Sequence, residues 1–236
     1  MGVFAALGTA LCWAIAARLF RGTGNAFSPL TMNFWKGLIS IAILAVVLVF
    51  VQPTGLTTHT ILWLLLSGLI GIGIGDTCFF KALQSIGDSQ AVLVAETLAP
   101  LFTALFAMAF IGEWITWQQW VGVAVVLLSV DMVIKARKRS TTHVFATSGY
   151  LYGVGAALCQ AVGAVVSRDI LSSGEVDAAS AAFLRLIGGM FFVVPFIAFT
   201  KTKYMPTITS GKRIWPAFIM ATLLGTTAAI YLQMFA

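Results

Sequence analysis

The strongest constraint on this chain is an apolar segment that occurs twice. Residues 8–21, GTALCWAIAARLFR, return 147 positions later as residues 155–168, GAALCQAVGAVVSR. Both copies lie in long apolar stretches, so the repeat predicts a duplicated helical bundle in a membrane, an arrangement typical of transporters. The matched residues are Gly8, Ala10, Leu11, Cys12, Ala14, Ala17 and Arg21 with Gly155, Ala157, Leu158, Cys159, Ala161, Ala164 and Arg168.

Composition agrees with a membrane location. Hydrophobic residues make up 60% of the 236 residues and charged residues only 9%, with a mean hydropathy of +0.99. A soluble domain of this length could not bury so much apolar surface, whereas lipid can cover it. The basic residues behind the net charge of +6 lie between the apolar spans, which is not a nucleic-acid pattern. The three cysteines have no metal-binding spacing, so we expect no metal site. No cofactor motif is seen either, and we expect neither a cofactor nor a nucleic-acid partner.

Eight segments are long and apolar enough to cross a bilayer as helices, which needs about 20 residues each. We therefore predict an all-α polytopic membrane protein whose main non-protein partner is the lipid bilayer. The predicted spans are residues 3–20, 29–51, 60–82, 89–111, 117–135, 147–167, 178–200 and 214–236.

The repeat extends beyond the first span. Phe34 and Lys36 match Phe183 and Arg185 at an offset of 149, and Gly71 matches Gly225 at an offset of 154. We expect a first repeat of five helices in residues 1–140 and a second, incomplete repeat of three helices in residues 147–236. Because five is odd, the second repeat enters the membrane from the opposite face, which predicts inverted repeats. The spans 89–111 and 117–135 have no second copy, so we expect a ten-helix architecture of which eight helices are present.

The basic residues predict an orientation. Eleven Lys and Arg residues lie at or after the ends of spans one, three, five and seven, against one, Arg168, on the other side. The positive-inside rule then places the larger set in the cytoplasm and the N-terminus outside. The eleven are Arg18, Arg21, Lys81, Lys135, Arg137, Lys138, Arg139, Lys201, Lys203, Lys212 and Arg213.

Three charged residues within the spans are candidates for a functional site. Lys36, Asp76 and Glu96 are each expected about 10 Å from the same membrane face, at 1.5 Å per residue. Charge at that depth is costly, so one hypothesis is a site for a proton or a cationic substrate. The alternative is a structural ion pair of Lys36 with either acid. Glu96 is the stronger functional candidate because it lies one turn before Pro100, whose missing N–H frees a carbonyl.

Three further residues are weaker candidates for substrate binding. Arg185 is the repeat counterpart of Lys36, and with no matching acid we expect it to snorkel toward the interface. Trp13 and Gln160 are repeat counterparts that could line a central cavity, or pack against lipid and neighbouring helices instead. Ser67, Gly71 and Gly75 form a small-residue stripe suited to close helix packing. No catalytic motif is seen, so we do not expect an enzyme.

Several of these segments, in order, resemble the EamA-type branch of the drug/metabolite transporter superfamily. The resemblance lies in Gly75-Asp76, residues 79–83 (FFKAL), Ile86-Gly87, residues 100–105 (PLFTAL), Gly112-Glu113 and Gly122. Residues 10–13 (ALCW) and 34–36 (FWK) resemble the signatures of the first two helices, with Lys36 where arginine is commoner. The resemblance implies ten helices in two inverted repeats, a central cavity and a cytoplasmic N-terminus. That N-terminal location disagrees with the charge count, and Glu96 is not part of the family pattern.

The leading hypothesis for function is a secondary transporter, an exporter or permease, that moves small organic metabolites. Proton coupling is part of this hypothesis. The alternatives are a membrane assembly protein that transports nothing and an inactive, truncated transporter fragment. We expect an integral protein of the inner membrane of a bacterial or archaeal cell. Substrate, direction and oligomeric state are left open by the sequence.

Overall fold

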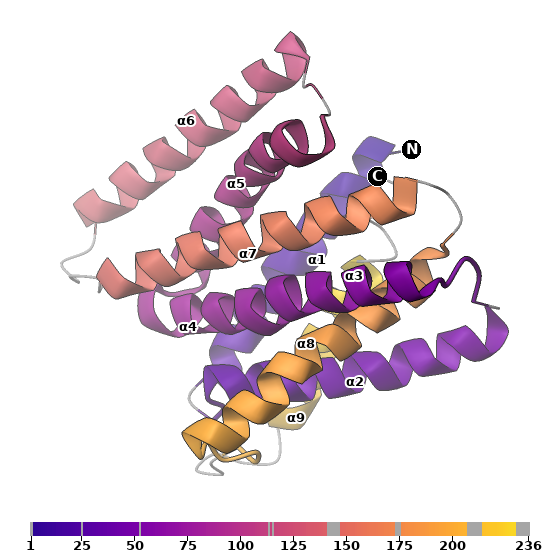
Figure 1. The fold of residues 1–236 in the computed structure, drawn as a ribbon. Helices are drawn as coiled ribbons and strands as arrows, with labels where there is room; N and C mark the ends of the chain where they lie inside the picture. Colours follow the sequence, from indigo (N-terminus) through magenta and orange to yellow (C-terminus); the bar gives the residue numbers. More distant parts are fainter. Residues whose placement is uncertain are drawn as a thin grey trace.

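The computed structural model is a bundle of apolar helices (Figure 1). It describes residues 2–24, 26–51, 53–112, 114, 116–140, 147–172, 176–206 and 214–229, without the side chains of 2–6, 130, 131, 133–140, 227 and 228. These residues contain helices and turns but no strand. Eight spans follow one another. They are α1 (Gly2–Thr23), α2 (Pro29–Phe50), α3 (Thr58–Gly68) with η1 (Leu69–Gly75) and α4 (Asp76–Ile86), α5 (Asp88–Phe106) with η2 (Ala107–Ile111), α6 (Trp117–Ser140), α7 (Thr147–Ser172), α8 (Ala178–Thr200), and α9 (Ile214–Thr222) with η3 (Leu223–Ala228).

The predicted class, an all-α polytopic membrane protein, is confirmed. Five helical spans of the described chain are long and apolar enough to cross a bilayer. They are Pro29–Phe50, Thr58–Ile86, Asp88–Ile111, Thr147–Ser172 and Ala178–Thr200, and the shorter apolar stretches Trp117–Ser129 and Ile214–Thr226 accompany them. The last predicted span, 214–236, can be followed only to residue 229, because the rest lies outside the described residues.

Local capping explains where several helices begin. Ser28 is the N-cap of α2, its hydroxyl accepts a hydrogen bond from the Thr31 N–H at 3.2 Å, and Pro29 occupies the first turn. Asp177 caps α8 in the same way through the Ser180 N–H at 2.8 Å. Gly87, with a φ of +87°, makes the turn between α4 and α5 that residues with a Cβ rarely adopt.

Two π-helical segments occupy matching positions in the two halves. η1 begins at Leu69 and contains Gly71, and η3 begins at Leu223 and contains Gly225, the repeat counterpart of Gly71. A π-segment disturbs the regular backbone hydrogen bonding of an α-helix, so both segments need support from neighbours. The two segments thus share a position in the repeat seen in the sequence, and the division into two repeats stays a prediction.

The helix contacts follow the same relationship. α1 packs against α9 and η3, while its repeat counterpart α7 packs against α3, η1 and α4. α2 packs against α8, its own counterpart. The central crossing of α2, α8 and the third span is visible in Figure 1. Whether a rotation axis relates these helices as inverted repeats stays a prediction.

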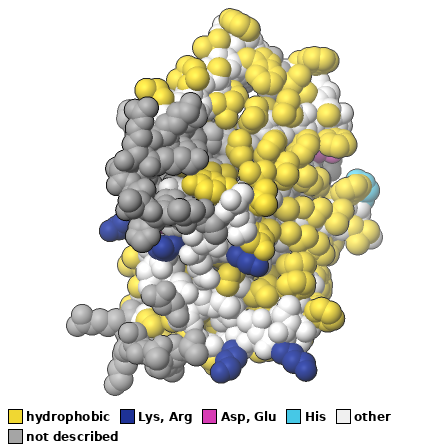
Figure 2. Space-filling view, turned by 90° about the vertical axis from the view of Figure 1, so that its left-hand side faces the viewer, with side chains coloured by type: hydrophobic (Ala, Val, Ile, Leu, Met, Phe, Trp, Pro, Cys, Tyr) yellow, Lys and Arg dark blue, Asp and Glu magenta, His cyan; other side chains and the backbone are white. Residues whose placement is uncertain are grey.

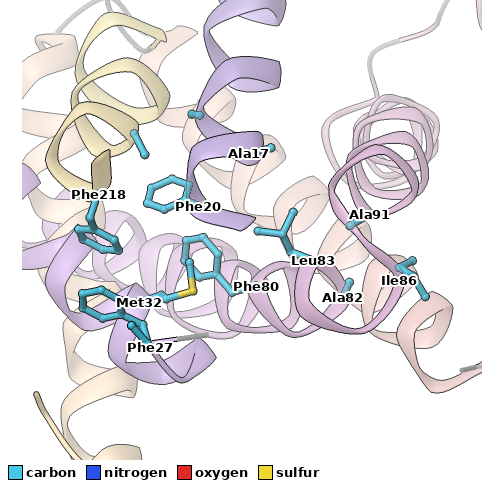
Figure 3. Packing of buried hydrophobic residues seen from close by; sticks show 13 residues of the cluster. Ala17, Phe20, Phe27, Met32, Phe80, Ala82, Leu83, Ile86, Ala91 and Phe218 are labelled. Atoms are coloured by element: carbon cyan, nitrogen blue, oxygen red, sulfur yellow. The ribbon is translucent and has the colours of Figure 1, made fainter. Parts of the chain in front are cut away.

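Aromatic rings fill the junction of α1, α2, α4 and α9 (Figure 3). Phe27 and Phe218 stack with ring centroids 4.8 Å apart, and Phe20 meets Phe80 edge-on at 5.1 Å. All four side chains are almost fully buried. Since lipid is as apolar as these rings, van der Waals contact holds the cluster together more than exclusion of water does.

One face of the bundle is broadly apolar. Figure 2 shows a broad hydrophobic face whose visible Lys and Arg side chains all lie in its lower half. Phe50, Phe110 and Phe199 are about four-fifths exposed, as expected of residues that face lipid. Thr31 binds the Lys203 carbonyl at 2.8 Å, so the start of α2 and the segment after α8 share an end. Lys203 therefore lies at the same end as the start of α2, whereas the side chains of 135–139 lie outside the described residues.

Candidate functional site at the centre of the bundle

Lys36 and Asp76 form an ion pair between α2 and the start of α4. The side chains are only 11% and 16% exposed, so the pair is largely withdrawn from the surface. Of the two acids that the sequence offered to Lys36, the structure selects Asp76. A buried cation and carboxylate must be paired to offset the cost of desolvation, so each residue depends on the other.

Glu96 lies beside this pair without joining it. It is half-buried on α5, within electrostatic reach of Asp76. Within the described residues it has no ion pair and its carboxylate has no hydrogen bond. α5 continues through Pro100, whose missing N–H leaves the Glu96 carbonyl without its usual helical donor. An unpaired carboxylate and a freed carbonyl therefore occur at the same residue.

Arg185 points into the bundle, so the predicted snorkelling toward the interface is wrong. Its Nη2 atom lies 3.4 Å and 3.5 Å from the positions that a Cβ would take at Gly163 and Gly71. Its Nε atom is buried without a hydrogen-bond partner, and the guanidinium is within electrostatic reach of Asp76. The two glycines explain the difference, because the absence of side chains on η1 and α7 leaves room for the guanidinium between them.

Trp13 and Gln160 lie beside the two π-segments, one in each half. The Trp13 indole N–H donates a hydrogen bond to the Gly225 carbonyl in η3 at 3.1 Å. Gln160 lies against η1, where its backbone nitrogen is 3.6 Å from the Cβ position of Gly75. The indole N–H of Trp13 thus supports the fold, and a role in substrate contact for either residue stays a prediction.

Asn33 is a central polar residue that sequence reasoning missed. Its Nδ2 lies 2.9 Å and 3.1 Å from the carbonyls of Ile72 and Gly73 and 3.0 Å from the Thr77 hydroxyl. It thereby satisfies carbonyls that the π-helical η1 exposes. The sequence did contain an indication of this role, because Asn33 precedes Lys36 by three residues and so lies on the same face of the helix.

The predicted small-residue stripe does pack closely. Ser67 donates a hydrogen bond to the Gly163 carbonyl at 2.9 Å and contacts the Ser167 hydroxyl at 2.8 Å. Gly71 lies against Gly163, and Gly75 lies against α7. The third span therefore approaches α7 nearly backbone to backbone, which fixes the depth of Asp76.

A hollow of about 240 Å³ lies away from this centre. It is lined by His59, Trp63, Phe110, Ile111, Val165, Val166, Asp169 and Ile170. None of the six predicted site residues is among them. The candidate site is therefore defined by the charged residues at the centre and not by this hollow.

Comparison with known proteins assigns the chain to a family. The model of the EamA-like transporter family matches residues 1–134, more than half of the sequence. The chain belongs to the EamA-like transporter family. This confirms the resemblance noted from the sequence, and it makes the chain an integral membrane protein of a transporter family.

Relatives of this EamA-like protein carry transporter names. It is 23% identical over 215 residues to the uncharacterized transporter YyaM of Bacillus subtilis, covering 89% of this chain and 69% of that one. It is 24% identical over 186 residues to an uncharacterized transporter of Archaeoglobus fulgidus, covering 78% and 64% of the two chains. The chain thus spans about two thirds of the length of these relatives.

A solved crystal structure shares the fold. It matches with a TM-score of 0.66 at 19% identity, covering 99% of this chain and 78% of that one. At this identity the match speaks for the architecture alone. The overall arrangement of helices is therefore one that a solved protein also adopts.

Proposed function

We propose that this protein is a secondary transporter of small organic metabolites in the inner membrane of a bacterial or archaeal cell, coupled to protons through Glu96. The family and the names of the relatives support transport. The observation that carries the coupling is Glu96 itself, a carboxylate without an ion-pair partner in the described structure beside the Lys36–Asp76 pair.

The physical basis is the cost of charge in a membrane. An ionised carboxylate at the depth of Glu96 needs a cation, a proton or water. Lys36 is already engaged by Asp76, so a proton is the simplest way to neutralise Glu96. A group that gains and loses a proton inside the bundle can link proton movement to reorientation of the two halves.

Reconstitution tests this proposal. The purified chain is placed in proteoliposomes, and uptake of a panel of labelled amino acids, sugars, nucleosides and carboxylic acids is measured with and without a pH gradient. We expect uptake of at least one class of compound, and we expect the pH gradient to accelerate it. The controls are protein-free liposomes and the double variant that combines Lys36→Met with Asp76→Asn. Uptake that does not respond to the gradient would remove proton coupling. No uptake of any class would favour an assembly protein or an inactive fragment.

A further inference from the structure

The central charges do not balance when Glu96 carries a proton. Lys36 and Asp76 neutralise one another, which leaves Glu96 and Arg185. Within the described residues neither of these two has a salt bridge or a side-chain hydrogen bond. Arg185 keeps its charge under all physiological conditions. With Glu96 protonated, the described centre therefore holds one uncompensated positive charge.

The surroundings of Arg185 favour an anion over a structural role. A guanidinium offers five donors, and the Nε donor of Arg185 is buried with nothing to accept it. Nη2 lies 3.5 Å and 3.4 Å from the positions that a Cβ would take at Gly71 and Gly163, which contribute no side chain. Leaving a buried cation without an anion costs several kcal/mol, so a binding partner that supplies two oxygen acceptors would be strongly favoured.

We propose that Arg185 binds the carboxylate of a monovalent organic anion, and that this anion binds together with a proton on Glu96. The inference rests on the proposed transport function and narrows its substrate class. Carboxylate oxygens match the fork of the guanidinium and can satisfy two of its donors at once. Protonated Glu96 and the bound anion then leave the centre neutral, so proton and anion cross the membrane as an electroneutral pair.

The titratable neighbours leave Glu96 as the group that responds to pH. The helices packed against α5 are α1, α4, α6 and α7, and the described side chains of α6 include none that titrates. Arg18 on α1 forms an ion pair with Asp88, at the start of α5, with Nη1 and Oδ2 3.6 Å apart. The other charged or titratable side chains on these helices are Cys12 and Arg21 on α1, Asp76, Cys78 and Lys81 on α4, and Tyr150, Tyr152, Cys159, Arg168 and Asp169 on α7. Of these, Asp76 is already paired with Lys36, which leaves Glu96 as the carboxylate at the centre without an ion-pair partner among the described residues.

Binding, measured apart from transport, tests the proposal. The purified chain in nanodiscs is titrated at fixed ionic strength with sodium benzoate, and with benzamide as the neutral molecule of the same shape. Thermal stability and tryptophan fluorescence report binding. The variants are Arg185→Met, which keeps length but loses charge, and Arg185→Lys, which keeps charge but loses the fork. Arg18→Met removes an exposed guanidinium and is the matched control.

We expect benzoate but not benzamide to bind. Arg185→Met should weaken benzoate binding at least tenfold, Arg185→Lys should weaken it less, and Arg18→Met should leave it unchanged. Above the pH at which Glu96 ionises in the free protein, the Kd should rise about tenfold per pH unit, as uptake of one proton requires. Glu96→Gln should bind benzoate with no such slope.

Three outcomes overturn the inference. Equal benzoate binding by wild type and Arg185→Met places the anion elsewhere, and equal binding of benzoate and benzamide shows that the carboxylate is not what the site recognises. A Kd that does not change with pH in the wild type breaks the link to Glu96. Each of these results is compatible with proton-coupled transport of another substrate class. Conversely, benzoate can still bind to a protein that shows no uptake in proteoliposomes. The two proposals therefore fail separately.

Discussion

The ammonium of Lys36 and the carboxylate of Asp76 neutralise one another in the middle of the bundle, across α2 and α4. Both side chains are withdrawn from the surface, so removing one leaves the other charged and unpaired. The pair also adjoins η1, whose C-terminal end passes directly into Asp76. Its integrity therefore bears on both stability and the position of the neighbouring Glu96.

We predict that Lys36→Met destabilises the protein by about 3–5 kcal/mol, the usual cost of an orphaned buried charge. Adding Asp76→Asn should restore much of the loss, because the double variant carries no unpaired charge. Unfolding in mixed micelles with increasing SDS measures both. A double variant as unstable as Lys36→Met alone would show that the pair is not what stabilises this region.

Glu96→Gln should separate function from folding. The change keeps shape and hydrogen bonding but removes the titrating group, and within the described residues Glu96 has no ion pair to lose. We expect stability within about 0.5 kcal/mol of wild type, as for a substitution that breaks no network. Uptake in proteoliposomes should lose its pH dependence.

Glu96→Asp is the control, since it keeps an ionisable group and should keep a pH-dependent rate. Aggregation of Glu96→Gln, or uptake that still varies with pH, would make Glu96 a structural residue. The measurements are the melting temperature in detergent and initial uptake rates at several pH values.

Close backbone approach predicts two intolerant glycines. A Cβ at Gly68 would overlap the Arg185 carbonyl, and one at Gly188 would overlap the Leu65 carbonyl. Neither carbonyl is a flexible side-chain end, so Gly68→Ala and Gly188→Ala should each lose about 1–3 kcal/mol or more. Gly155→Ala is the matched control, because nothing lies within 4 Å of its Cβ position. Equal melting temperatures for all three variants would contradict the observed packing of α3 against α8.

Much of the fold could be predicted because single residues signal it locally. Ser28 and Pro29 mark the start of α2, and the apolar lengths give the spans. Gly71 and Gly225 extended the repeat that residues 8–21 and 155–168 revealed, but they did not predict the π-helices around them, since no local residue pattern distinguishes a π-segment from an α-helix. The backbone there depends on remote donors such as Asn33 and Trp13.

The sequence predicted how deep in the membrane the central charged residues lie. It did not predict which way each side chain points around its helix. Lys36, Asp76 and Glu96 share a depth, so the sequence could not say which acid Lys36 meets; the rotation of each helix decides that. Arg185 was misplaced for a related reason. Its guanidinium turns inward because Gly71 and Gly163, on two other spans, leave space. Such space depends on long-range packing that no local pattern shows.

Orientation can be tested from the two ends of the bundle. The count of Lys and Arg predicts that the segment after α8 faces the cytoplasm and that the loop before α3 faces outward. Met205→Cys and Leu56→Cys place one thiol in each, and both positions are exposed. In intact cells an impermeant thiol reagent should label Leu56→Cys only, and after lysis it should label both. Labelling of Met205→Cys alone in intact cells would mean that the family orientation holds instead.

Acid should weaken the start of α8 through Asp177. Burial raises the pKa of this carboxyl, but hydrogen bonds from Ser180 and from the Thr54 N–H at 3.3 Å outweigh burial and hold the pKa below its ordinary 3.8. A lowered pKa in the folded state means that the cap stabilises above pH 3.8 and loses its contribution as the pH falls through the folded value. Asp177→Ala should cost about 0.5–2 kcal/mol at neutral pH, as loss of an N-cap does. Asp177→Asn keeps an acceptor that does not titrate, so its melting temperature should fall less than that of wild type between pH 5 and pH 3. Parallel curves for Asp177→Asn and wild type would assign the acid sensitivity to another carboxylate.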